Sequence, residues 1–428
     1  MLFERIATLT PSGILHNQYI ETRGAYITYI GTNPPPSYRG ETYPGEGRLL
    51  LPAFYSAHGH TPMTLLRGYG EGLTLHDWLF TRVFPFEARM TPEDIYWATL
   101  LGAAEMARYG LVSVSDMYCK LDQMARAFHE SGLKVNLCNG TTSSGDTPYE
   151  KLNSTIETHR ALADWHGADD GRIQIELGLH AEYTTDEGIV RAVAEDAARL
   201  NARVQVHLSE TLSEHEGCKA RRGGRTPTRY LDDCGLFAQP TTAAHGVHLE
   251  AGDWEILSAR GVTLATCPKS NLKLASGVFN APKAMQAGVN IALGTDSVAS
   301  NNSLNPIEEM RALLLLQNGL WGDPTALGAA QAFAIASRNG ALSQGRDDCG
   351  HIKEGFRADL CVLDVTGAGM HPVHDLLQSA AYSASGSDIV LTMCDGRVVY
   401  RDGAFPTIDV ARAKAECGKA AARIAGES

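Results

Sequence analysis

Short apolar runs alternate with helical patterns through the middle of the chain. The runs are Val112–Ser115, Ile173–Leu177, Val204–Val206, Thr241–Ala244, Val262–Ala265 and Val289–Leu293. Helical segments lie between most of them, for example residues Asp186–Leu200. Strands that alternate with helices over ~300 residues are typical of a β/α barrel or of a doubly wound parallel sheet.

Two helices can be delimited from their ends. Thr91 is a good N-cap residue, Pro92 suits the first helical position, and Asp94 places a negative charge in the first turn. Apolar residues then follow at helical spacing until Gly110, which favours the end of the helix. The tail, residues 409–425, is rich in alanine and also predicts one helix.

Both ends of the chain have a β-type pattern. The first fifty residues contain runs such as Tyr26–Ile30, separated by glycines and by the turn cluster Pro34–Ser37. The same pattern returns at Asp359–Asp364 and at Ile389–Tyr400, which contains an Asp395-Gly turn. We therefore expect the two termini to meet in one small β domain.

Composition limits the class of partner. The 428 residues carry a net charge of −12 with a pI near 5.7, so no basic surplus exists to neutralise nucleic-acid phosphates, and a small-molecule substrate is expected. No apolar stretch is long enough to cross a membrane, and the first residues lack a secretory pattern. Nine scattered cysteines without a C-x-x-C pair indicate reduced thiols, which predicts a cytoplasmic protein.

Potential metal ligands follow the apolar runs. His58 and His60 come after Leu50–Tyr55, and the other candidates are His180, His207, His245 and Asp296, each just after a run of its own. In a β/α barrel, side chains at the carboxyl ends of the strands converge on one site. Six polar groups from five strands would then share one mouth.

Each candidate also has an ordinary interpretation. His58-Gly-His60 places two imidazoles on one side of an extended strand, but most such pairs bind no metal. His207, with Glu210 three residues later, could be a plain strand end, and Asp296 could be a helix N-cap. His245 is favoured over His248 because it lies nearer its strand end. The coincidence of all these positions favours a metal site.

Three histidines and one aspartate suit Zn²⁺, although Fe²⁺ or Mn²⁺ would also fit. A bound metal makes water acidic enough to supply hydroxide at neutral pH, and a nearby carboxylate that is not a ligand can accept the proton. Glu210 is the best candidate for that carboxylate. The segment Ile173–Tyr183 has no lysine to bridge two metals, so one metal per chain is expected.

The chain resembles the amidohydrolase superfamily and, within it, the 5′-methylthioadenosine/S-adenosylhomocysteine deaminase family. The matching segments run through almost the whole chain: Ala57–Gly68, Trp78–Phe80, Phe84–Glu87, Leu179–Tyr183, His207–Glu210, Ala244–Leu249, Ser270–Leu274, Leu293–Ser303, Gly355–Leu360 and Phe405–Asp409. The resemblance implies a (β/α)8 TIM-like barrel over residues 53–349. It also implies a small composite β-sandwich formed by residues 1–52 and 350–428, with the C-terminal helix attached.

The resemblance also implies the roles of individual residues. One zinc would be held by His58, His60, His207 and Asp296. Glu210 would move a proton from water to the ring N1, His245 would orient the nucleophile, and Asp296 would also contact the attacking water. Glu87 would hold the ribose hydroxyls, His180 would contact the nucleoside, and Trp78 would belong to the substrate pocket. Attack at C6 would release ammonia and leave an inosine-type product.

The chain departs from the family at three positions. Relatives that accept S-adenosylhomocysteine use two arginines for its carboxylate, whereas this chain has Asn139 and Lys151 there. Neither offers the bidentate guanidinium fork. We therefore expect adenosine, 5′-deoxyadenosine or 5′-methylthioadenosine as substrate. Thr266 stands where relatives often have a histidine.

Other functions use the same metal ligands. The main alternative is an amidohydrolase acting on guanine, cytosine, a pterin or a triazine. Glu87 weakly favours a nucleoside over these free bases, because a free base has no ribose diol for the carboxylate to hold. Glu87 could also be an ordinary surface acid after Pro85. A non-catalytic scaffold would have lost ligands, and here every ligand is present. A homo-oligomer is expected, without a preference between dimer and tetramer.

Overall fold

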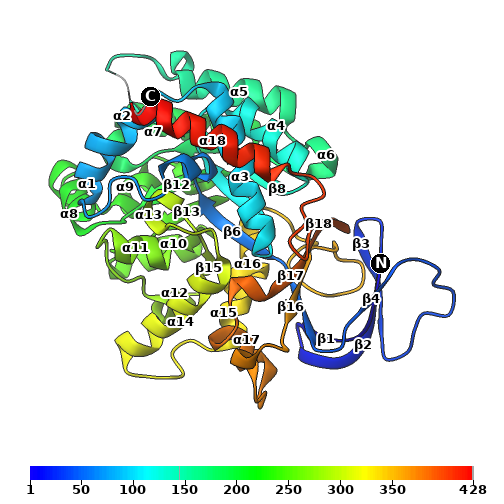
Figure 1. Cartoon of the computed structure of the whole chain (residues 1–428). Helices are drawn as coiled ribbons and strands as arrows, with labels where there is room; N and C mark the ends of the chain where they lie inside the picture. Colours follow the sequence, from blue (N-terminus) through cyan, green and yellow to red (C-terminus); the bar gives the residue numbers. More distant parts are fainter. Residues whose placement is uncertain (144, 427–428) are drawn as a thin grey trace.

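Strands from both ends of the chain pair in one mixed sheet in this computed structural model, which describes residues 1–143 and 145–426 (Figure 1). The strands are β1 (Leu2–Thr10), β2 (Gly13–Arg23), β3 (Tyr26–Gly31), β4 (Thr42–Pro44), β5 (Arg48–Pro52), β16 (Leu360–Asp364), β17 (Ile389–Cys394) and β18 (Arg397–Arg401). They lie in the order β18-β17-β16-β5-β1-β2-β3, and β4 pairs with β1. The antiparallel pairing of β5 with β16 confirms that the two termini meet.

A second set of strands is entirely parallel. It comprises β6 (Phe54–Gly59), β7 (Leu111–Met117), β8 (Lys134–Cys138), β9 (Gly140–Thr141), β10 (Ile173–Ile175), β11 (Leu177–Leu179), β12 (Val204–Leu208), β13 (Thr241–His245), β14 (Thr263–Thr266) and β15 (Asn290–Leu293). The pairing runs β6-β7-β8-β10, and from β9, which continues β8, through β11-β12-β13-β14-β15. A parallel bridge between Gly59 and Asp296 returns the pairing to β6.

Helices lie between most of the parallel strands, and further helices follow β15. They are α1 (Leu75–Trp78), α2 (Phe84–Glu87), α3 (Pro92–Arg108), α4 (Leu121–Ser131), α5 (Asn153–Trp165), α6 (Ala168–Gly171), α7 (Glu187–Leu200), α8 (Leu212–Arg221), α9 (Pro227–Asp233), α10 (Ala251–Ala259), α11 (Pro268–Lys273), α12 (Ala281–Gln286), α13 (Val298–Asn301), α14 (Pro306–Trp321), α15 (Ala329–Ala336), α16 (Arg338–Ser343), α17 (Leu376–Tyr382) and α18 (Val410–Ala425). Within the described residues, no helix combines the length and apolarity needed to span a membrane.

Single helical turns complete the set. They are η1 (Thr61–Leu66), η3 (Tyr149–Lys151), η4 (Glu182–Thr184), η5 (Leu236–Ala238), η6 (Ala368–Met370) and η7 (Gly386–Asp388), and a π-helical turn, η2 (Leu79–Val83), joins α1 to α2.

The predicted helix ends are confirmed by their capping contacts. The Thr91 hydroxyl accepts the N–H of Asp94, whose carboxylate accepts the N–H of Thr91, a reciprocal capping box at the start of α3. The Asp409 side chain caps α18 in the same position. The α18 helix, red in Figure 1, lies against α3.

Two strands differ from the apolar runs of the sequence. The run Leu50–Tyr55 divides at Ala53 between β5 of the mixed sheet and β6 of the parallel set. The strand β8 lies outside the apolar runs named from the sequence, because Lys134 and Asn136 interrupt its hydrophobic pattern although both are buried. Asp296 is not a helix N-cap, since Ser297 caps α13.

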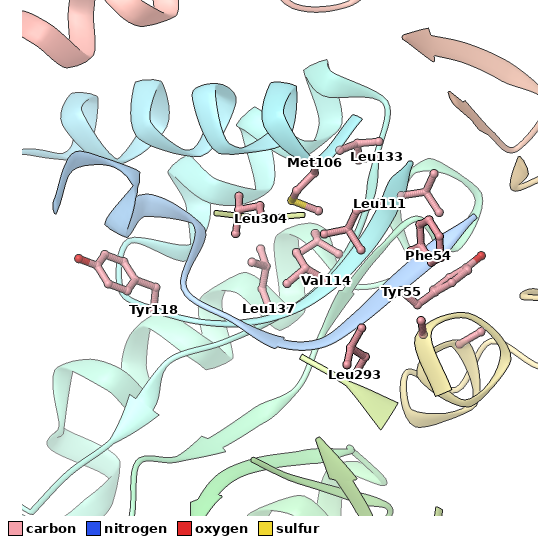
Figure 2. Packing of buried hydrophobic residues seen from close by; sticks show 14 of the residues in the cluster. Phe54, Tyr55, Met106, Leu111, Val114, Tyr118, Leu133, Leu137, Leu293 and Leu304 are labelled. Carbon is pink, nitrogen blue, oxygen red and sulfur yellow. The ribbon is translucent and has the colours of Figure 1, made fainter. Parts of the chain in front are cut away.

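A large apolar core packs the parallel strands against α3. Figure 2 shows Phe54 and Tyr55 of β6 beside Leu111 and Val114 of β7, with Met106 of α3 next to them. All are buried, as expected for parallel strands that are covered on both faces. The strand ends that carry the candidate ligands therefore rest on a tightly packed support.

Lys134 joins the parallel strands to the mixed sheet through a buried ion pair. Its Nζ lies 2.6 Å from both carboxylate oxygens of Asp359 and 2.7 Å from Oδ1 of Asp395, and all three side chains are buried. The Tyr55 hydroxyl also donates to Asp359. Burial lowers the pKa of Lys134, but the two carboxylates outweigh it and raise the pKa above its ordinary value.

Replacing Lys134 by methionine is expected to destabilise the fold strongly. The change leaves Asp359 and Asp395 buried without their shared cation, and breaking a buried pair from one side costs about 3–5 kcal/mol. The measurement is the shift of the urea midpoint followed by circular dichroism. Arg191→Met, which removes the exposed pair with Glu187, is the control and should barely move the midpoint. Equal shifts for the two variants would contradict the prediction.

Candidate active site

The candidate ligands converge at the carboxyl ends of the parallel strands. His58 lies in β6, His60 directly after it, His207 in β12, and Asp296 just after β15. His58 Nε2 is 3.6 Å and His60 Nε2 is 3.3 Å from Asp296 Oδ1, and the Nε2 atoms of His60 and His207 are 3.4 Å apart. The four residues, predicted from three strand ends, therefore surround one point.

Hydrogen bonds leave a free lone pair on three of these ligands, His60, His207 and Asp296. His60 Nδ1 lies 2.6 Å from the carbonyl of Met117, and His207 Nδ1 lies 2.7 Å from the carbonyl of His180. Each Nδ1 must donate to its carbonyl, so each Nε2 keeps a lone pair. Ser270 donates to Oδ2 of Asp296, which leaves Oδ1 for a ligand bond.

The cluster fits a metal ion. His58 Nε2 is buried and has no hydrogen-bond partner among the described residues, a costly state unless something else is bound. The donor atoms of His58, His60 and Asp296 all lie within 4.8 Å of one another. The donor atoms of His58, His207 and His245 form a second such group. Nitrogen and oxygen donors in this number suit a borderline divalent metal.

The ionisation states agree with this. Burial, and then the neighbouring imidazoles, hold the pKa values of His58 and His207 well below the ordinary value. Burial raises the pKa of Asp296, but His60, His245 and the Ser270 hydroxyl together outweigh burial, so the pKa lies below its ordinary value. Neutral imidazoles and an ionised carboxylate are the states that bind metals.

Glu210 and His245 form a pair beside the ligand cluster. His245 Nε2 lies 3.6 Å from Glu210 Oε2. The Ser276 hydroxyl donates to Glu210 Oε1 at 2.9 Å, and His245 Nδ1 lies 2.9 Å from the side-chain oxygen of Asn271. Burial lowers the pKa of His245, but the carboxylates of Glu210 and then Asp296 raise it above the ordinary value. Burial also raises the pKa of Glu210, which suits a group that gains and loses a proton.

Three backbone conformations at this site are unusual. Ser209, His245 and Asp296 have φ values of 46°, 72° and 53°. Left-handed backbone at residues other than glycine costs about 1–3 kcal/mol each and gathers at functional sites. Each of these residues ends or follows a parallel strand, so the strained backbone lies at the strand ends that carry the candidate site residues.

A cavity of about 200 Å³ opens onto the ligand cluster. Nine of the side chains named from the sequence are among the residues that line it: His60, Trp78, Glu87, Asn139, His180, His207, Glu210, His245 and Asp296. Lys151 does not line it, because it is exposed on η3.

Glu87 is held at the cavity wall by Tyr118. It ends the helical segment α1-η2-α2, which begins at the N-cap Thr74. The Tyr118 hydroxyl donates to Glu87 Oε1 at 2.5 Å. Burial raises the pKa of Glu87, while the Tyr118 hydrogen bond and His60 act in the opposite direction.

His180 is held in its neutral form next to the ligands. Its Nδ1 lies 3.0 Å from the Thr184 hydroxyl. Burial, and then the neighbouring His60, lower the pKa of His180 to about 4. Its other ring nitrogen remains available to a bound molecule.

The sequence did not single out the residues that support this site. Tyr118, Asn271, Ser276 and Glu214 each contact a candidate site residue, but as single polar residues they carry no recognisable pattern. Ser270 and Asn271 lie in a segment already matched to the family, and this was the only available signal. Thr266 is buried at the end of β14, where its hydroxyl has no partner among the described residues.

Comparisons with known proteins agree with this geometry. The 5-methylthioadenosine/S-adenosylhomocysteine deaminase of Pelotomaculum thermopropionicum is 38% identical over 417 residues, covering 97% of this chain and 95% of the relative. The 5′-deoxyadenosine deaminase of Methanothermobacter thermautotrophicus is 39% identical over 385 residues, covering 89% of each chain.

Solved structures show the same fold. A zinc-bound adenosine deaminase from Xanthomonas campestris superposes with a TM-score of 0.92 at 29% identity, covering 99% of this chain and 98% of that one. Atrazine chlorohydrolase from Arthrobacter aurescens superposes with a TM-score of 0.91, covering 98% and 99%, but at 20% identity it shows the fold alone. The model of the Amidohydrolase family matches residues 49–399. The chain belongs to the amidohydrolase family.

Proposed function

We propose that the protein is a zinc-dependent deaminase that converts adenosine-type nucleosides and water into inosine-type nucleosides and ammonia. The observation that carries the proposal is one cavity that combines the ligand cluster, the Glu210–His245 pair and a separate carboxylate, Glu87. The names of the two relatives reported above, both deaminases of adenosine derivatives, support the same substrate class.

The strand pairing supports a more detailed fold assignment. We propose that the circle of parallel strands is a (β/α)8 barrel over residues 53–349. Residues 1–52 and 350–428 would form the composite β-sandwich domain, with α18 attached. The return of the pairing from Asp296 to Gly59 supports this division.

The proposed metal ligands are His58, His60, His207 and Asp296. A zinc ion held by them would act as a Lewis acid that makes water acidic enough to lose a proton near neutral pH. Fe²⁺ or Mn²⁺ would fit the same donors.

Glu210 accepts the proton of the attacking water and delivers it to N1 of the purine ring. His245 is well placed to orient the water, because its Nδ1 donates to Asn271 and its Nε2 faces Glu210. Asp296 contacts the same water. Attack at C6 forms the C6–O bond and makes that carbon tetrahedral. The remaining proton of the new C6 hydroxyl then passes to the 6-amino group, the C6–N bond breaks, and ammonia leaves while C6=O forms beside the protonated N1.

Glu87 binds the ribose hydroxyls in this proposal. Tyr118 occupies only Oε1 of Glu87, so Oε2 is free to accept from a diol. His180, neutral at physiological pH, offers its free ring nitrogen to the nucleoside. Trp78 supplies apolar surface to the pocket.

The cavity favours an uncharged 5′ group. Among the described residues that line it, the charged ones are acids and none is lysine or arginine. The Asn139 amide donates to the Glu157 carboxylate at 2.6 Å, so a further negative charge lies behind the wall. These contacts support adenosine, 5′-deoxyadenosine or 5′-methylthioadenosine over S-adenosylhomocysteine, whose carboxylate would find no lysine or arginine among the described lining residues of this cavity.

Glu210→Gln should lower kcat for adenosine by about 10²–10⁴-fold, because the amide cannot carry the proton. The measurement is ammonia release, with zinc content determined on the same samples. Zinc content should not change, since Glu210 is not a proposed ligand, whereas His207→Asn should lose zinc. A Glu210→Gln variant with wild-type kcat would contradict the proton-transfer role.

Glu87→Ala should lower kcat/KM for adenosine by about 10- to 100-fold, because hydrogen bonds to a charged group contribute about 1.5–3 kcal/mol. Activity on adenine, which has no ribose, should stay at its wild-type level. Tyr118→Phe, which removes only the partner of Glu87, serves as the matched control and should give a smaller loss. An unchanged kcat/KM for adenosine in Glu87→Ala would refute the ribose role.

A carboxylate on the 5′ group should reduce turnover. We expect kcat/KM for 5′-methylthioadenosine to exceed that for 5′-carboxymethylthioadenosine by about tenfold or more, because the carboxylate meets acids and no cation. Glu157→Gln should narrow this ratio. Glu150→Gln, on the exposed turn η3, makes the same charge change away from Asn139 and should leave the ratio as it is. A ratio near one in the wild-type protein would exclude charge selection.

A further inference from the structure

Glu210 stands on a strained turn between β12 and α8. The residue before it, Ser209, is fully buried and has left-handed backbone with a φ of 46°. A serine adopts this conformation only where its surroundings hold it. The direction in which Glu210 leaves the turn therefore depends on the contacts of the backbone around Ser209.

The carbonyl of Ser209 is anchored by the neighbouring strand end. It accepts the N–H of Val247 at 3.1 Å and the N–H of His248 at 3.0 Å, both from the loop after β13. These bonds hold one face of the turn. They leave the N–H groups of Ser209 and Glu210 to be satisfied from elsewhere.

Glu214 satisfies both of these N–H groups. One of its carboxylate oxygens accepts from Ser209 N at 2.9 Å and the other from Glu210 N at 2.7 Å, and the side chain is buried. Glu214 is the third residue of α8, and its own N–H donates to the hydroxyl of the N-cap Thr211.

This arrangement differs from an ordinary capping box. In a capping box the third-residue carboxylate accepts the N–H of the N-cap residue itself. Here the Glu214 carboxylate reaches past Thr211 to the two residues before it. Its hydrogen bonds therefore go to the turn that carries Glu210, and the helix start is capped by Thr211 alone.

The other end of Glu210 is equally constrained. Its carboxylate accepts from Ser276 and faces His245. The side chain thus spans from a backbone position held by Glu214 to a carboxylate position held by Ser276. A small rotation of the turn would move the carboxylate away from the cavity.

We propose that Glu214 is a positioning residue whose carboxylate holds the Ser209–Glu210 turn so that Glu210 points at the reacting water and ring. The inference rests on the proposed deaminase function for its kinetic consequence. Its structural part, that Glu214 holds the turn, stands on the two backbone hydrogen bonds.

The test compares Glu214→Gln with a matched control, Asp94→Asn. Glutamine keeps the shape but can accept only one of the two N–H groups, because its amide nitrogen is a donor. Asp94 is also a third-residue carboxylate, which accepts the N–H of Thr91 in α3. The control changes the same kind of backbone contact, together with the ion pair of Asp94 with Arg423, at a helix start that does not line the cavity.

We expect Glu214→Gln to lower kcat for adenosine by about 10- to 100-fold, the cost of a small misplacement of a reacting group. KM, the affinity for the product inosine and the zinc content should change by less than about twofold, because the ligands and the ribose contacts are untouched. Amide exchange of residues 209–211 should become faster. Asp94→Asn should lower the melting temperature but leave kcat and this exchange unchanged.

A Glu214→Gln variant with wild-type kcat and wild-type exchange would overturn the proposal. So would a loss of kcat accompanied by equal losses of zinc and inosine affinity, which indicates general distortion. If Glu214→Gln does not fold, Glu214→Asp replaces it in the test, because the shorter side chain is expected to reach only one of the two N–H groups. A wild-type kcat in Glu214→Asp would also overturn the proposal. A wild-type protein inactive on all adenosine derivatives would refute the deaminase function, while the exchange result would still decide the role of Glu214.

Discussion

The junction between the first and the last parallel strands is the constraint on which the site depends. The N–H of Asp296 donates to the carbonyl of His58 at 3.1 Å, and Gly59 forms a bridge with Asp296. Gly294 allows this approach, because a Cβ there would lie 2.7 Å from Cys267 Sγ and 3.1 Å from the Cβ of His58. The contact joins the start and the end of the parallel set, so that the histidines of β6 and the aspartate after β15 share one metal-sized space.

Hydrogen bonds from surrounding groups then determine which atoms of these side chains can bind a metal. Carbonyl acceptors select the tautomers of His60 and His207, and serine hydroxyls occupy the second oxygen of Asp296. His60, His207 and Asp296 thus each direct a free lone pair to the centre of the cluster, while their other polar atom is hydrogen-bonded to a surrounding group. The Nε2 of His58, buried and without a partner among the described residues, is the counterpart of this arrangement and fits a bound metal.

The acidic residues of the cavity lie in two places, near the metal-donor cluster and on the wall proposed to bind the substrate. Glu210 and Asp296 lie near the donor cluster, where a cation would offset them, whereas Glu87 lies on the wall with Tyr118. With no lysine or arginine among its described lining residues, the cavity suits a neutral molecule that offers hydrogen-bond donors. This electrostatic character agrees with a nucleoside substrate that has a small 5′ group.

The sequence by itself determined the β/α alternation, the meeting of the two β-rich ends, the helix caps and the metal-ligand candidates, because these depend on local periodicity and on the positions of histidines after apolar runs. The strand β8 was hidden, since its buried Lys134 finds partners only in Asp359 and Asp395, far away in the chain. The tertiary structure alone decided that Asn139 bonds Glu157, that Lys151 stays outside the cavity, and that Glu214 holds the turn of Glu210. These contacts join single polar residues across loops, and no periodic pattern in a sequence encodes such pairs.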